Sequence, residues 1–563
     1  MLKIGKILQD AGLVTAGDIE AAVEIQRQNG KYLGEILIEM GKITEESLLE
    51  CLSRQMNIPY VRLRSAEIPR EAIEKMPVKF VWHYKIMPVR YENNILTVAI
   101  SDPLNTWPLD GIKMQLKTEI DTVLSTSGDI SEAMHRYYGV GSETVEKILS
   151  KEEEKRDPAV TTLEPVEDIE KLAGDASVVQ LVNQILVEAI HTRATDVHFE
   201  PYDKELVVRY RVDGVLQPAK VSDDIRYLYK AIVARIKIMT GLDMVERRLP
   251  QSGGTRVRLE NRQFDLRVSV IPDAYGEGVV IRVLPTEMLM SLEHLGMSPE
   301  DLKLAQDLIA HPHGLVFVTG PTGSGKTTTL YACLSRLNQP NVKIITVEDP
   351  VEYKLRFVEQ IQVHTKAGLT FSQVLRSVLR HDPDIIMVGE VRDHETAEIA
   401  VQASLTGHLV LSTLHTNDAA GAVTRLLDMQ IEPYLVSSTV LGVVAQRLVR
   451  KVCPHCAKDQ PWDPSGLPAV LRESIPGPEL QSVKRAVGCD RCRQSGYQGR
   501  LAIYEILPFT PEIHELVIRR ASAGEVKKVA CAAGMRTLFQ SGWEKIRQGD
   551  TTPEELLRVV QTA

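Results

Sequence analysis

Short apolar runs in the second half of the chain are each followed by polar residues. Three of them are Leu315–Thr319, Ile344–Val347 and Ile385–Val388, and a fourth lies within LTGHLVLSTLHTND. Such a run is typical of a strand buried on both faces of a parallel sheet. Helix-like segments separate the runs, so residues 289–563 are predicted to form an α/β domain.

Upstream of this domain the pattern alternates between apolar and polar residues. The amphipathic helix pattern SVVQLVNQILVEAI precedes the alternating stretches ELVVRYRVDGVLQ, QFDLRVSVIP and GEGVVIRVLP. These patterns predict an α+β domain over residues 173–288. Before it, SKEEEKRDPAVTTLEPVEDIEK carries charge and proline without an apolar stripe, so residues 141–172 are predicted to be a flexible linker.

The first 55 residues contain an internal repeat with a period of 29. Each copy predicts a short helix, a glycine stop and a second helix. Residues 56–140 mix helix and strand signals, including the strand pattern NILTVAI, and complete a predicted N-terminal domain over residues 1–140. The repeated residues are Gly5, Leu8, Gly12, Ile19, Val23 and Gln26, which recur as Gly34, Leu37, Gly41, Leu48, Leu52 and Gln55.

Composition narrows the class of protein. The chain has 563 residues, 44% apolar and 25% charged, which is ordinary for a globular protein of several domains. Its net charge of −9 argues against a nucleic-acid coat. We find neither a 20-residue uncharged apolar run nor the apolar core of a signal peptide in MLKIGKILQDAG. We therefore expect a soluble cytoplasmic protein.

The most specific motif is GPTGSGKT, which stands between a predicted strand and a predicted helix. Its glycines let backbone amides point at phosphates, and the helix N-terminus adds partial positive charge. Lys326 is expected to reach the β- and γ-phosphates, and the Thr327 hydroxyl to bind Mg²⁺. The predicted nucleotide-binding residues are Gly320, Pro321, Thr322, Gly323, Ser324, Gly325, Lys326, Thr327 and Thr328.

Acidic residues and histidines flank the other apolar runs. Glu348, with Asp349 and Glu352 after it, ends one run, and Gly389-Glu390 ends another, where many nucleotide hydrolases carry Asp. Ligands bind at the carboxyl ends of parallel strands, so these carboxylates are candidates for orienting water or acting on the hydration shell of magnesium. His408 and His415 bracket the fourth run as candidate γ-phosphate sensors.

Two CxxC pairs predict a metal site. CPHC at 453–456 and CDRC at 489–492 can supply four thiolates, Cys453, Cys456, Cys489 and Cys492, to a closed tetrahedral site. Such a site favours structural Zn²⁺, although an iron–sulfur cluster uses the same ligands. A disulfide would need an oxidising compartment. The predicted metal subdomain covers about residues 450–500, and His455 inside the first pair is expected to be exposed.

These motifs resemble the hexameric ATPases of type II secretion and type IV pilus assembly. GPTGSGKT resembles the Walker A motif of that family, TVEDPVEY its aspartate box, MVGEVRD its atypical Walker B motif and TGHLVLSTLHTND its histidine box. The α+β domain resembles the second N-terminal domain of the family in ATDVHFEP, RYRVDGVL and FDLRVSVIP. One departure is Pro250-Gln251-Ser252-Gly253, where the family usually has Pro-Gln-Asp-Gly.

The resemblance implies a RecA-like P-loop ATPase domain preceded by an α+β, PAS-like domain and a small mixed N-terminal module. It implies Glu390 as the catalytic carboxylate, Glu348 assisting at the metal or water, and His415, with His408 as a second candidate, in the histidine-box role. It also implies Zn²⁺ at the cysteines. Arginines expected to act on a neighbouring subunit are Arg209 and Arg226, with Arg376, Arg380 and Arg392 as further candidates.

The N-terminal repeat resembles the cyclic-di-GMP-binding module of some family members. Lys3–Gln26 and Tyr32–Gln55 match the spacing of its two motifs, but Lys3 and Tyr32 stand where each motif usually begins with Arg. Lys only partly replaces the stacking and bidentate binding of Arg, and Tyr stacks without charge. Cyclic-di-GMP binding and a purely structural docking role both remain open.

The motifs predict an ATPase that uses ATP and Mg²⁺. The resemblance implies that it also binds Zn²⁺ and works as a homohexamer in pilus or pseudopilus assembly. Its expected partners are an inner-membrane platform protein and a cytoplasmic adaptor, which would hold it at the cytoplasmic face of the inner membrane; no nucleic acid is expected. Two alternatives are a P-loop hexamer that translocates nucleic acid and a cyclic-di-GMP-sensing scaffold with weak ATPase activity.

Overall fold

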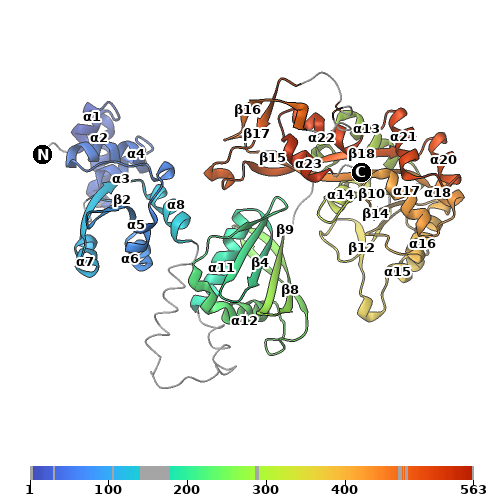
Figure 1. The fold of residues 1–563 in the computed structure, drawn as a ribbon, viewed down its shortest axis with the longest axis horizontal. Helices are drawn as coiled ribbons and strands as arrows, with labels where there is room; N and C mark the ends of the chain where they lie inside the picture. Colours follow the sequence, from blue (N-terminus) through green and yellow to red (C-terminus); the bar gives the residue numbers. More distant parts are fainter. Residues whose placement is uncertain are drawn as a thin grey trace. The chain divides into compact units, whose positions relative to one another are not determined.

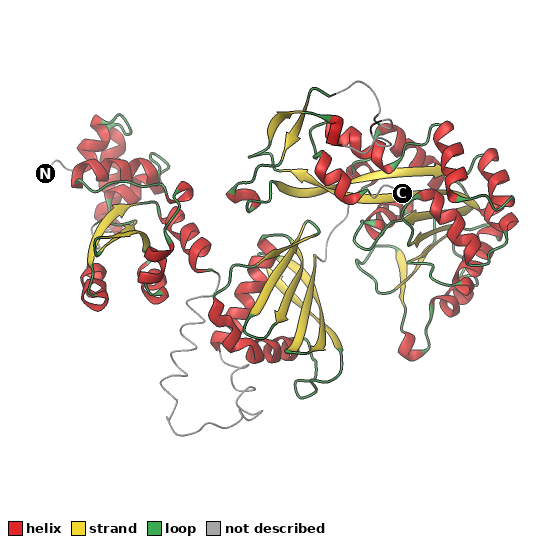
Figure 2. Cartoon of the chain, viewed as in Figure 1, coloured by secondary structure: helices red, strands yellow, loops and turns green. Residues whose placement is uncertain are grey.

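The computed structural model describes residues 4–29, 32–103, 107–139, 176–285, 291–466, 472, 475 and 480–560. The chain divides into two compact units. The helices and strands of each unit are drawn in Figures 1 and 2. One comprises Met1–Leu259 with Asp265–Val283, and the other Glu260–Phe264 with Leu284–Ala563. The predicted linker at 141–172 lies outside the described residues. In the described part of the chain, no helix is long and apolar enough to cross a membrane.

The N-terminal repeat folds as two helix pairs. The helices are α1 (Ile4–Asp10), α2 (Ala16–Asn29), α3 (Leu33–Glu39) and α4 (Glu45–Met56). The turns between paired helices contain Gly12 and Gly41, whose φ angles of 72° and 67° favour glycine. The two pairs share one core that includes Leu8 and Leu37, each fully buried. The 29-residue period therefore corresponds to a repeated helix–glycine turn–helix unit.

A three-stranded sheet follows the repeat, in the strand order β1-β2-β3. Strand β1 is antiparallel to β2, and β2 is parallel to β3. Helices cover the sheet and enclose a core in which Leu96 and Val98 of β2 are fully buried. The elements are η1 (Leu63–Ser65), α5 (Arg70–Lys75), α6 (Val78–Tyr84), β1 (Met87–Glu92), β2 (Ile95–Ile100), α7 (Trp107–Leu116), β3 (Glu119–Leu124) and α8 (Ser127–Tyr138).

Residues 176–285 form a six-stranded sheet with the strand order β6-β5-β4-β9-β8-β7. Helix α11 lies against β4 and α12 packs on α11 (Figure 1). Buried and partly buried residues alternate along the strands because the sheet buries one of its faces. In β5, for example, Leu206, Val208 and Tyr210 are buried. The elements are α11 (Ala176–His191), β4 (Ala194–Pro201), β5 (Leu206–Val212), β6 (Val215–Pro218), η2 (Asp223–Leu228), α12 (Tyr229–Met239), β7 (Gln251–Leu259), β8 (Arg262–Asp273) and β9 (Gly276–Pro285).

The second unit is built on a seven-stranded sheet with the strand order β12-β11-β13-β14-β10-β15-β18. The first six strands run parallel, and β18 is antiparallel to β15. All four apolar runs of the sequence are strands of this sheet, and β10, β11, β13 and β14 are buried throughout. The strands are β10 (Gly314–Thr319), β11 (Ile344–Glu348), β12 (Val358–Gln362), β13 (Ile385–Val388), β14 (Leu409–Leu414), β15 (Val440–Val452) and β18 (Tyr497–Pro508).

Helices cover both faces of this sheet and enclose two apolar cores. The architecture confirms the predicted α/β class. A separate two-stranded sheet, β16 (Lys458–Pro461) and β17 (Ser482–Arg485), lies beside the cysteine pairs. The helices are η3 (Leu292–Leu295), α13 (Pro299–Ile309), α14 (Lys326–Leu337), η4 (Thr365–Ala367), α15 (Phe371–Val378), α16 (His394–Leu405), α17 (Ala419–Asp428), α18 (Pro433–Thr439), η5 (Pro464–Gly466), η6 (Asp490–Cys492), α20 (Pro511–Ile518), α21 (Ala523–Ala532), α22 (Leu538–Arg547) and α23 (Pro553–Val559).

Candidate nucleotide-hydrolysis and metal sites

The GPTGSGKT loop leaves the carboxyl end of β10 and ends where α14 begins at Lys326. Gly320 has φ 148°, and a Cβ there would lie 2.4 Å from the carbonyl oxygen of Gln446. Gly325 has φ 87°, and its Cβ would lie 2.8 Å from Nε2 of Gln446. Both positions therefore require glycine on conformational and steric grounds. The outer loop residues Pro321, Thr322 and Gly323 are exposed, as is Thr327 on the first turn of α14.

The side chain of Lys326 lies under this loop. Its ammonium group donates hydrogen bonds to the carbonyl oxygens of Gly320 at 2.8 Å and Pro321 at 3.1 Å. Burial lowers the pKa of Lys326 to about 8; nearby Glu390 opposes the shift and Arg447 adds to it. The lysine is therefore poorly solvated and bonded only to neutral carbonyls in these two contacts. An anionic phosphate would be a much better partner for its charge.

Glu390 and His415 follow β13 and β14 at the same edge of the sheet as the loop. Nε2 of His415 lies 3.4 Å from Oε2 of Glu390, and the guanidinium of Arg392 lies 2.6 Å from Oε1. The Glu390 side chain remains 14% exposed, so its carboxylate contacts Arg392, His415 and solvent. The structure thus gathers Lys326, Glu390 and His415 at one edge.

His408 lies at the other end of β14. Strand β14 pairs in parallel with β10 from Gly314↔Leu409 to Thr319↔Leu414, so His408 precedes the strand end that is remote from Gly320. Six residues of strand separate the two edges by about 20 Å. Its Nδ1 lies 2.8 Å from the carbonyl oxygen of Ala403. The structure does not bring His408 to the phosphate loop, because the two histidines flank opposite ends of one strand.

Gly389 occupies the position at which many nucleotide hydrolases carry an Asp. Its amide donates to the carbonyl oxygen of Val347 at 2.8 Å. A Cβ at residue 389 would lie 3.2 Å from that oxygen and 3.4 Å from Cα of Glu348. Glycine at this position lets the end of β13 pack closely on the end of β11. A side chain would push the two strand ends apart and move Glu390 with them.

Glu348 is buried, with only 3% of the residue exposed. Its Oε2 accepts a hydrogen bond from the Tyr331 hydroxyl at 2.5 Å. Its Oε1 accepts hydrogen bonds from the Thr346 hydroxyl at 2.6 Å and from Nε2 of Gln360 at 3.0 Å. The carboxylate of Glu348 is thus surrounded by three neutral donors of the protein interior. The expectation that Glu348 assists at the metal or water stays a prediction.

Two residues of β15 belong to the site although no sequence motif marked them. The Thr329 hydroxyl donates to Oε1 of Gln446 at 2.6 Å, which ties α14 to β15 under the loop. Arg447 donates to the carbonyl and side-chain oxygens of Asn417 at 3.1 Å and 3.0 Å. Burial lowers the pKa of Arg447, against the attraction of Asp418. The available signal was a polar Gln-Arg pair inside the long apolar run of β15.

Comparison with known proteins settles the family. Residues 171–558 match the profile of the family described as "Type II/IV secretion system protein", and residues 56–144 match the MshEN domain. The chain belongs to the type II/IV secretion system protein family. It is an ATPase of the class that serves type II secretion and type IV pilus assembly.

Relatives of both kinds resemble nearly the whole chain. The type IV pilus assembly ATPase PilB of Myxococcus xanthus is 42% identical over 99% of this chain and 98% of its own. The type II secretion system protein E of Xanthomonas campestris is 40% identical over 97% and 96%. The X-ray structure of the Legionella pneumophila ATPase DotB aligns with a TM-score of 0.50 at 21% identity, covering 66% of this chain and 93% of that chain. This last likeness confirms the fold of the ATPase domain.

In this secretion-family ATPase, the arginines expected to act between subunits are bonded locally. Arg209 lies 2.5 Å from Oε2 of Glu200, and Arg226 lies 2.6 Å from the Tyr227 hydroxyl; both arginines are in the first unit. In the second unit, Arg376 pairs with Glu395 at 2.8 Å, and Arg380 donates to the carbonyl oxygen of Arg376 at 2.7 Å. Their action on a neighbouring subunit stays a prediction.

The four cysteines of the two CxxC pairs converge. Their sulfur atoms all lie within 4.8 Å of one another, and none is in a disulfide. The backbone amides of Cys489 and Gly496 lie 3.1 Å and 3.2 Å from Sγ of Cys492. Four convergent sulfurs with amide donors suit a metal that prefers thiolate ligands, so this cluster could hold Zn²⁺. His455 is exposed and contacts Arg491, as expected of a non-ligand.

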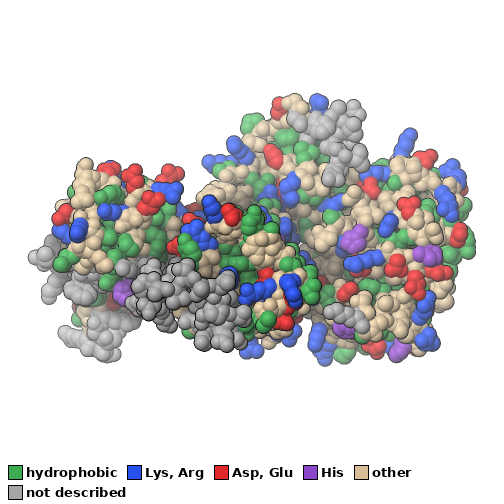
Figure 3. Space-filling view, turned by 60° about the horizontal axis from the view of Figure 1, so that its bottom comes forward, with side chains coloured by type: hydrophobic (Ala, Val, Ile, Leu, Met, Phe, Trp, Pro, Cys, Tyr) green, Lys and Arg blue, Asp and Glu red, His purple; other side chains and the backbone are tan. Residues whose placement is uncertain are grey.

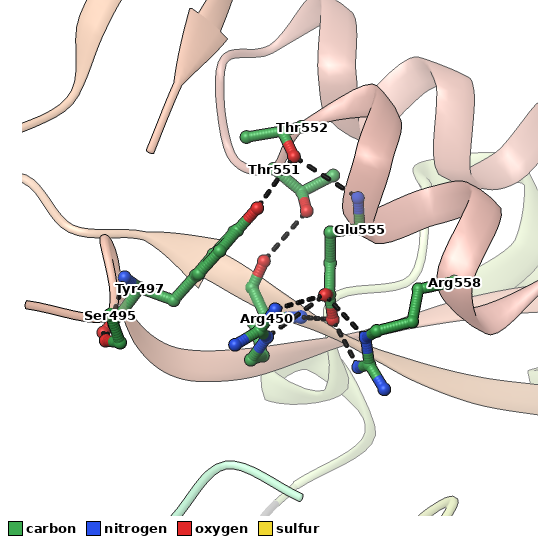
Figure 4. Close-up of polar contacts among 7 residues, drawn as sticks. All are labelled: Arg450, Ser495, Tyr497, Thr551, Thr552, Glu555 and Arg558. Atoms are coloured by element: carbon green, nitrogen blue, oxygen red, sulfur yellow. Dashed lines mark hydrogen bonds and ion pairs between the residues drawn. The ribbon is translucent and has the colours of Figure 1, made fainter. Parts of the chain in front are cut away.

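A buried ion pair holds β15 beside this cluster (Figure 4). Glu555 of α23 is fully buried and accepts hydrogen bonds from Arg450 of β15 at 2.8 Å and from Arg558 at 2.6 Å. The Thr551 hydroxyl donates to the carbonyl oxygen of Arg450, and the guanidinium of Arg450 lies 4.0 Å from the ring centre of Tyr497. The strand that supports the phosphate loop at Gln446 is thus fixed again before it reaches Cys453.

The candidate cyclic-di-GMP residues are only partly described. Lys3 lies outside the described residues. Tyr32 is 59% exposed and immediately precedes α3. The MshEN match begins at residue 56, directly after the second repeat.

Proposed function

We propose that the chain is a homohexameric motor that uses ATP hydrolysis to assemble a pilus or pseudopilus. The observation that carries this proposal is the meeting of Lys326, Glu390 and His415 at the carboxyl edge of the sheet, beside the glycine loop. Membership of the family establishes the ATPase activity. The residues at this edge of the sheet are the ones proposed to bind the phosphates and to act on water.

Each residue has a role that its surroundings support. The loop amides and Lys326 bind the phosphates, and the exposed Thr327 hydroxyl is available to Mg²⁺. When bound, Mg²⁺ neutralises phosphate charge during transfer. Glu390 is partly exposed and accepts the proton of the attacking water. His415 lies within reach of the same carboxylate and orients it toward the γ-phosphate.

Subunit mixing tests the hexamer together with its proposed trans arginines. Lys326→Ala chains lack a working loop, and Arg209→Ala chains lack the arginine; each alone should hydrolyse ATP poorly. If Arg209 serves a neighbour, mixed rings contain complete sites and activity returns. Arg226→Ala is the second variant. A mixture as inactive as its components, in rings shown by mass to be mixed, would refute action in trans.

The cysteine cluster is proposed to hold one structural Zn²⁺. The four convergent sulfurs support this, and their closed arrangement supports a structural rather than a catalytic role. Metal analysis of the purified chain should find about one zinc per chain. Cys453→Ser should lose it, while Cys333→Ser, at a buried cysteine outside the cluster, should retain it.

Cyclic-di-GMP binding is proposed for the N-terminal repeat. The duplicated helix pairs and the exposed ring of Tyr32 support it, because an exposed aromatic ring can stack on a guanine. Titration of the full chain with cyclic-di-GMP should saturate, and Tyr32→Ala should weaken binding. Absence of saturable binding at micromolar nucleotide would leave the repeat a docking module.

Nucleic-acid translocation is the alternative that the surface disfavours. On the face shown in Figure 3, basic and acidic side chains are interspersed, and the chain carries a net charge of −9. A translocase would be strongly stimulated by DNA in a salt-dependent way. We expect single-stranded and duplex DNA to leave ATP hydrolysis unchanged.

We also propose that partner proteins hold the motor at the cytoplasmic face of the inner membrane.

A further inference from the structure

Tyr331 connects the helix that follows the phosphate loop to the aspartate-box segment. It lies on α14, five residues after Lys326, and is 4% exposed. Its hydroxyl donates to Oε2 of Glu348 and accepts from the backbone amides of Glu352 at 3.3 Å and Tyr353 at 3.4 Å. One buried hydroxyl therefore bonds both the end of β11 and the loop that follows it.

Gln360 of β12 also contacts the Glu348 carboxylate and the loop after β11. Its Nε2 donates to Oε1 of Glu348 at 3.0 Å and to the carbonyl oxygen of Tyr353 at 2.9 Å, while its Oε1 accepts from the amide of Leu355 at 2.7 Å. The carboxylate of Glu348 is thus held from α14, from its own strand and from β12. Groups held from three elements have one available orientation.

The end of β11 in turn abuts the turn that carries Glu390. The amide of Gly389 bonds the carbonyl oxygen of Val347, and Gly389 packs close to Cα of Glu348. A continuous set of contacts therefore runs from Lys326 through α14 to Tyr331, Glu348, Gly389 and Glu390. Displacing the Glu348 carboxylate would move the catalytic turn relative to the phosphate loop.

We propose that Tyr331 and Glu348 form a buried positioning pair that fixes the distance between the phosphate loop and Glu390. Glu348 then contributes to hydrolysis without touching nucleotide or metal, and Tyr331 contributes by holding Glu348. This inference rests on the proposed role of Glu390 as the carboxylate that acts on water. Burial, with Glu348 beside it, raises the pKa of Tyr331, which keeps its hydroxyl a donor throughout the neutral range.

A double-mutant cycle on the full chain tests the pair. Tyr331→Phe should lower kcat by about 10- to 100-fold, because displacement of catalytic groups by about 1 Å has effects of this size. The Kd for ATP should change by less than about threefold, since the loop and Lys326 are intact. Glu348→Gln should lower kcat similarly, and the double variant should be no worse than Glu348→Gln alone.

The control is Tyr497→Phe, which removes a hydroxyl hydrogen bond to Thr552 elsewhere in the same unit. It should leave kcat unchanged. If the loss of any tyrosine hydroxyl in this unit lowered kcat by destabilising the fold, both tyrosine variants would lose activity. If Tyr331→Phe does not fold, Gln360→Met removes another donor to Glu348 from a partly exposed position and should again lower kcat with Kd unchanged.

Three results would overturn the proposal: wild-type kcat in Tyr331→Phe, losses that multiply in the double variant, or a loss of ATP affinity that matches the loss of kcat. Failure of the proposed function is separate from all three. It would appear as wild-type hydrolysis in Glu390→Gln, whatever the coupling between Tyr331 and Glu348.

Discussion

The ends of two neighbouring strands, β11 and β13, each present a glutamate, and the two glutamates have opposite surroundings. Glu390 is partly exposed and meets Arg392 and His415. Glu348 is buried and accepts hydrogen bonds from three neutral donors. A carboxylate that must take a proton from water needs access to that water, whereas one that holds a position needs fixed partners.

Residue type and place in the sheet therefore do not assign a role by themselves. Glu348 is the last residue of β11, Glu390 lies two residues after β13, and the two strands pair in parallel with Val347 opposite Val388. The side chain of Glu390 turns toward Arg392 and His415, and that of Glu348 turns toward α14 and β12. This difference makes Glu390 the proposed catalytic residue and Glu348 the proposed positioning residue.

The largest expected effect is on Glu390. Glu390→Gln cannot accept a proton from water and should lower kcat by about 10³-fold, within the range for loss of a general base. ATP binding should persist, because the phosphate loop is unchanged. Steady-state phosphate release and equilibrium ATP binding measure the two quantities. Lys326→Ala provides the contrast, since it should lose ATP binding as well.

The next effect tests the close packing between the two strand ends. Gly389→Ala would place a methyl group 3.2 Å from the carbonyl oxygen of Val347, so the turn must shift. We expect kcat to fall by about tenfold with little change in the Kd for ATP. Gly128→Ala is the control, since a Cβ there meets no atom within 4 Å. Equal activity of both variants would contradict the need for glycine at 389.

We expect the affinity for ATP to depend on pH because of Lys326, whose ammonium group lies near Glu390. Its pKa is lowered to about 8 in the free protein, and bound phosphate favours the charged lysine. ATP binding should therefore take up a proton and weaken as pH rises above about 8, by at most about tenfold per pH unit. Titration calorimetry in buffers of different ionisation enthalpy measures the uptake. Lys326→Arg should remove this dependence.

Glu555, which is buried like Glu348, should affect stability more than hydrolysis. Unlike Glu348, it pairs with arginines, and its removal would leave Arg450 largely buried without its carboxylate, which costs about 3–5 kcal/mol. Amide exchange at Arg450, whose amide donates to Oε1 of Glu555, should accelerate in Glu555→Ala. The exposed neighbour Glu554 gives the control Glu554→Ala. Unchanged exchange in Glu555→Ala would show that the pair does not hold β15.

Sequence motifs predicted those parts of the site whose residues are close together along the chain. The glycines, Lys326 and Thr327 occupy one loop and one helix turn, so spacing alone predicted their arrangement. The repeated glycine turns at Gly12 and Gly41 were predictable for the same reason. The family resemblance supplied Glu390 and His415, which the structure brings together.

Contacts between segments that are distant along the chain could not be predicted from the sequence. The direction of Glu348 depends on Tyr331 and Gln360, which come from α14 and β12. Gln446 meets the loop only because β15 pairs with β10. His408 and His415 share one motif, and only the register of β14 against β10 reveals that they occupy opposite edges.

The most direct test of the central claim compares Glu348→Gln with Glu390→Gln in one preparation, by ATP affinity and single-turnover hydrolysis. We predict wild-type-like affinity in both, a loss of about 10³-fold in hydrolysis for Glu390→Gln, and a loss of at most about 100-fold for Glu348→Gln. Equal losses, or a larger loss for Glu348→Gln, would contradict the assignment of catalysis to Glu390 and positioning to Glu348.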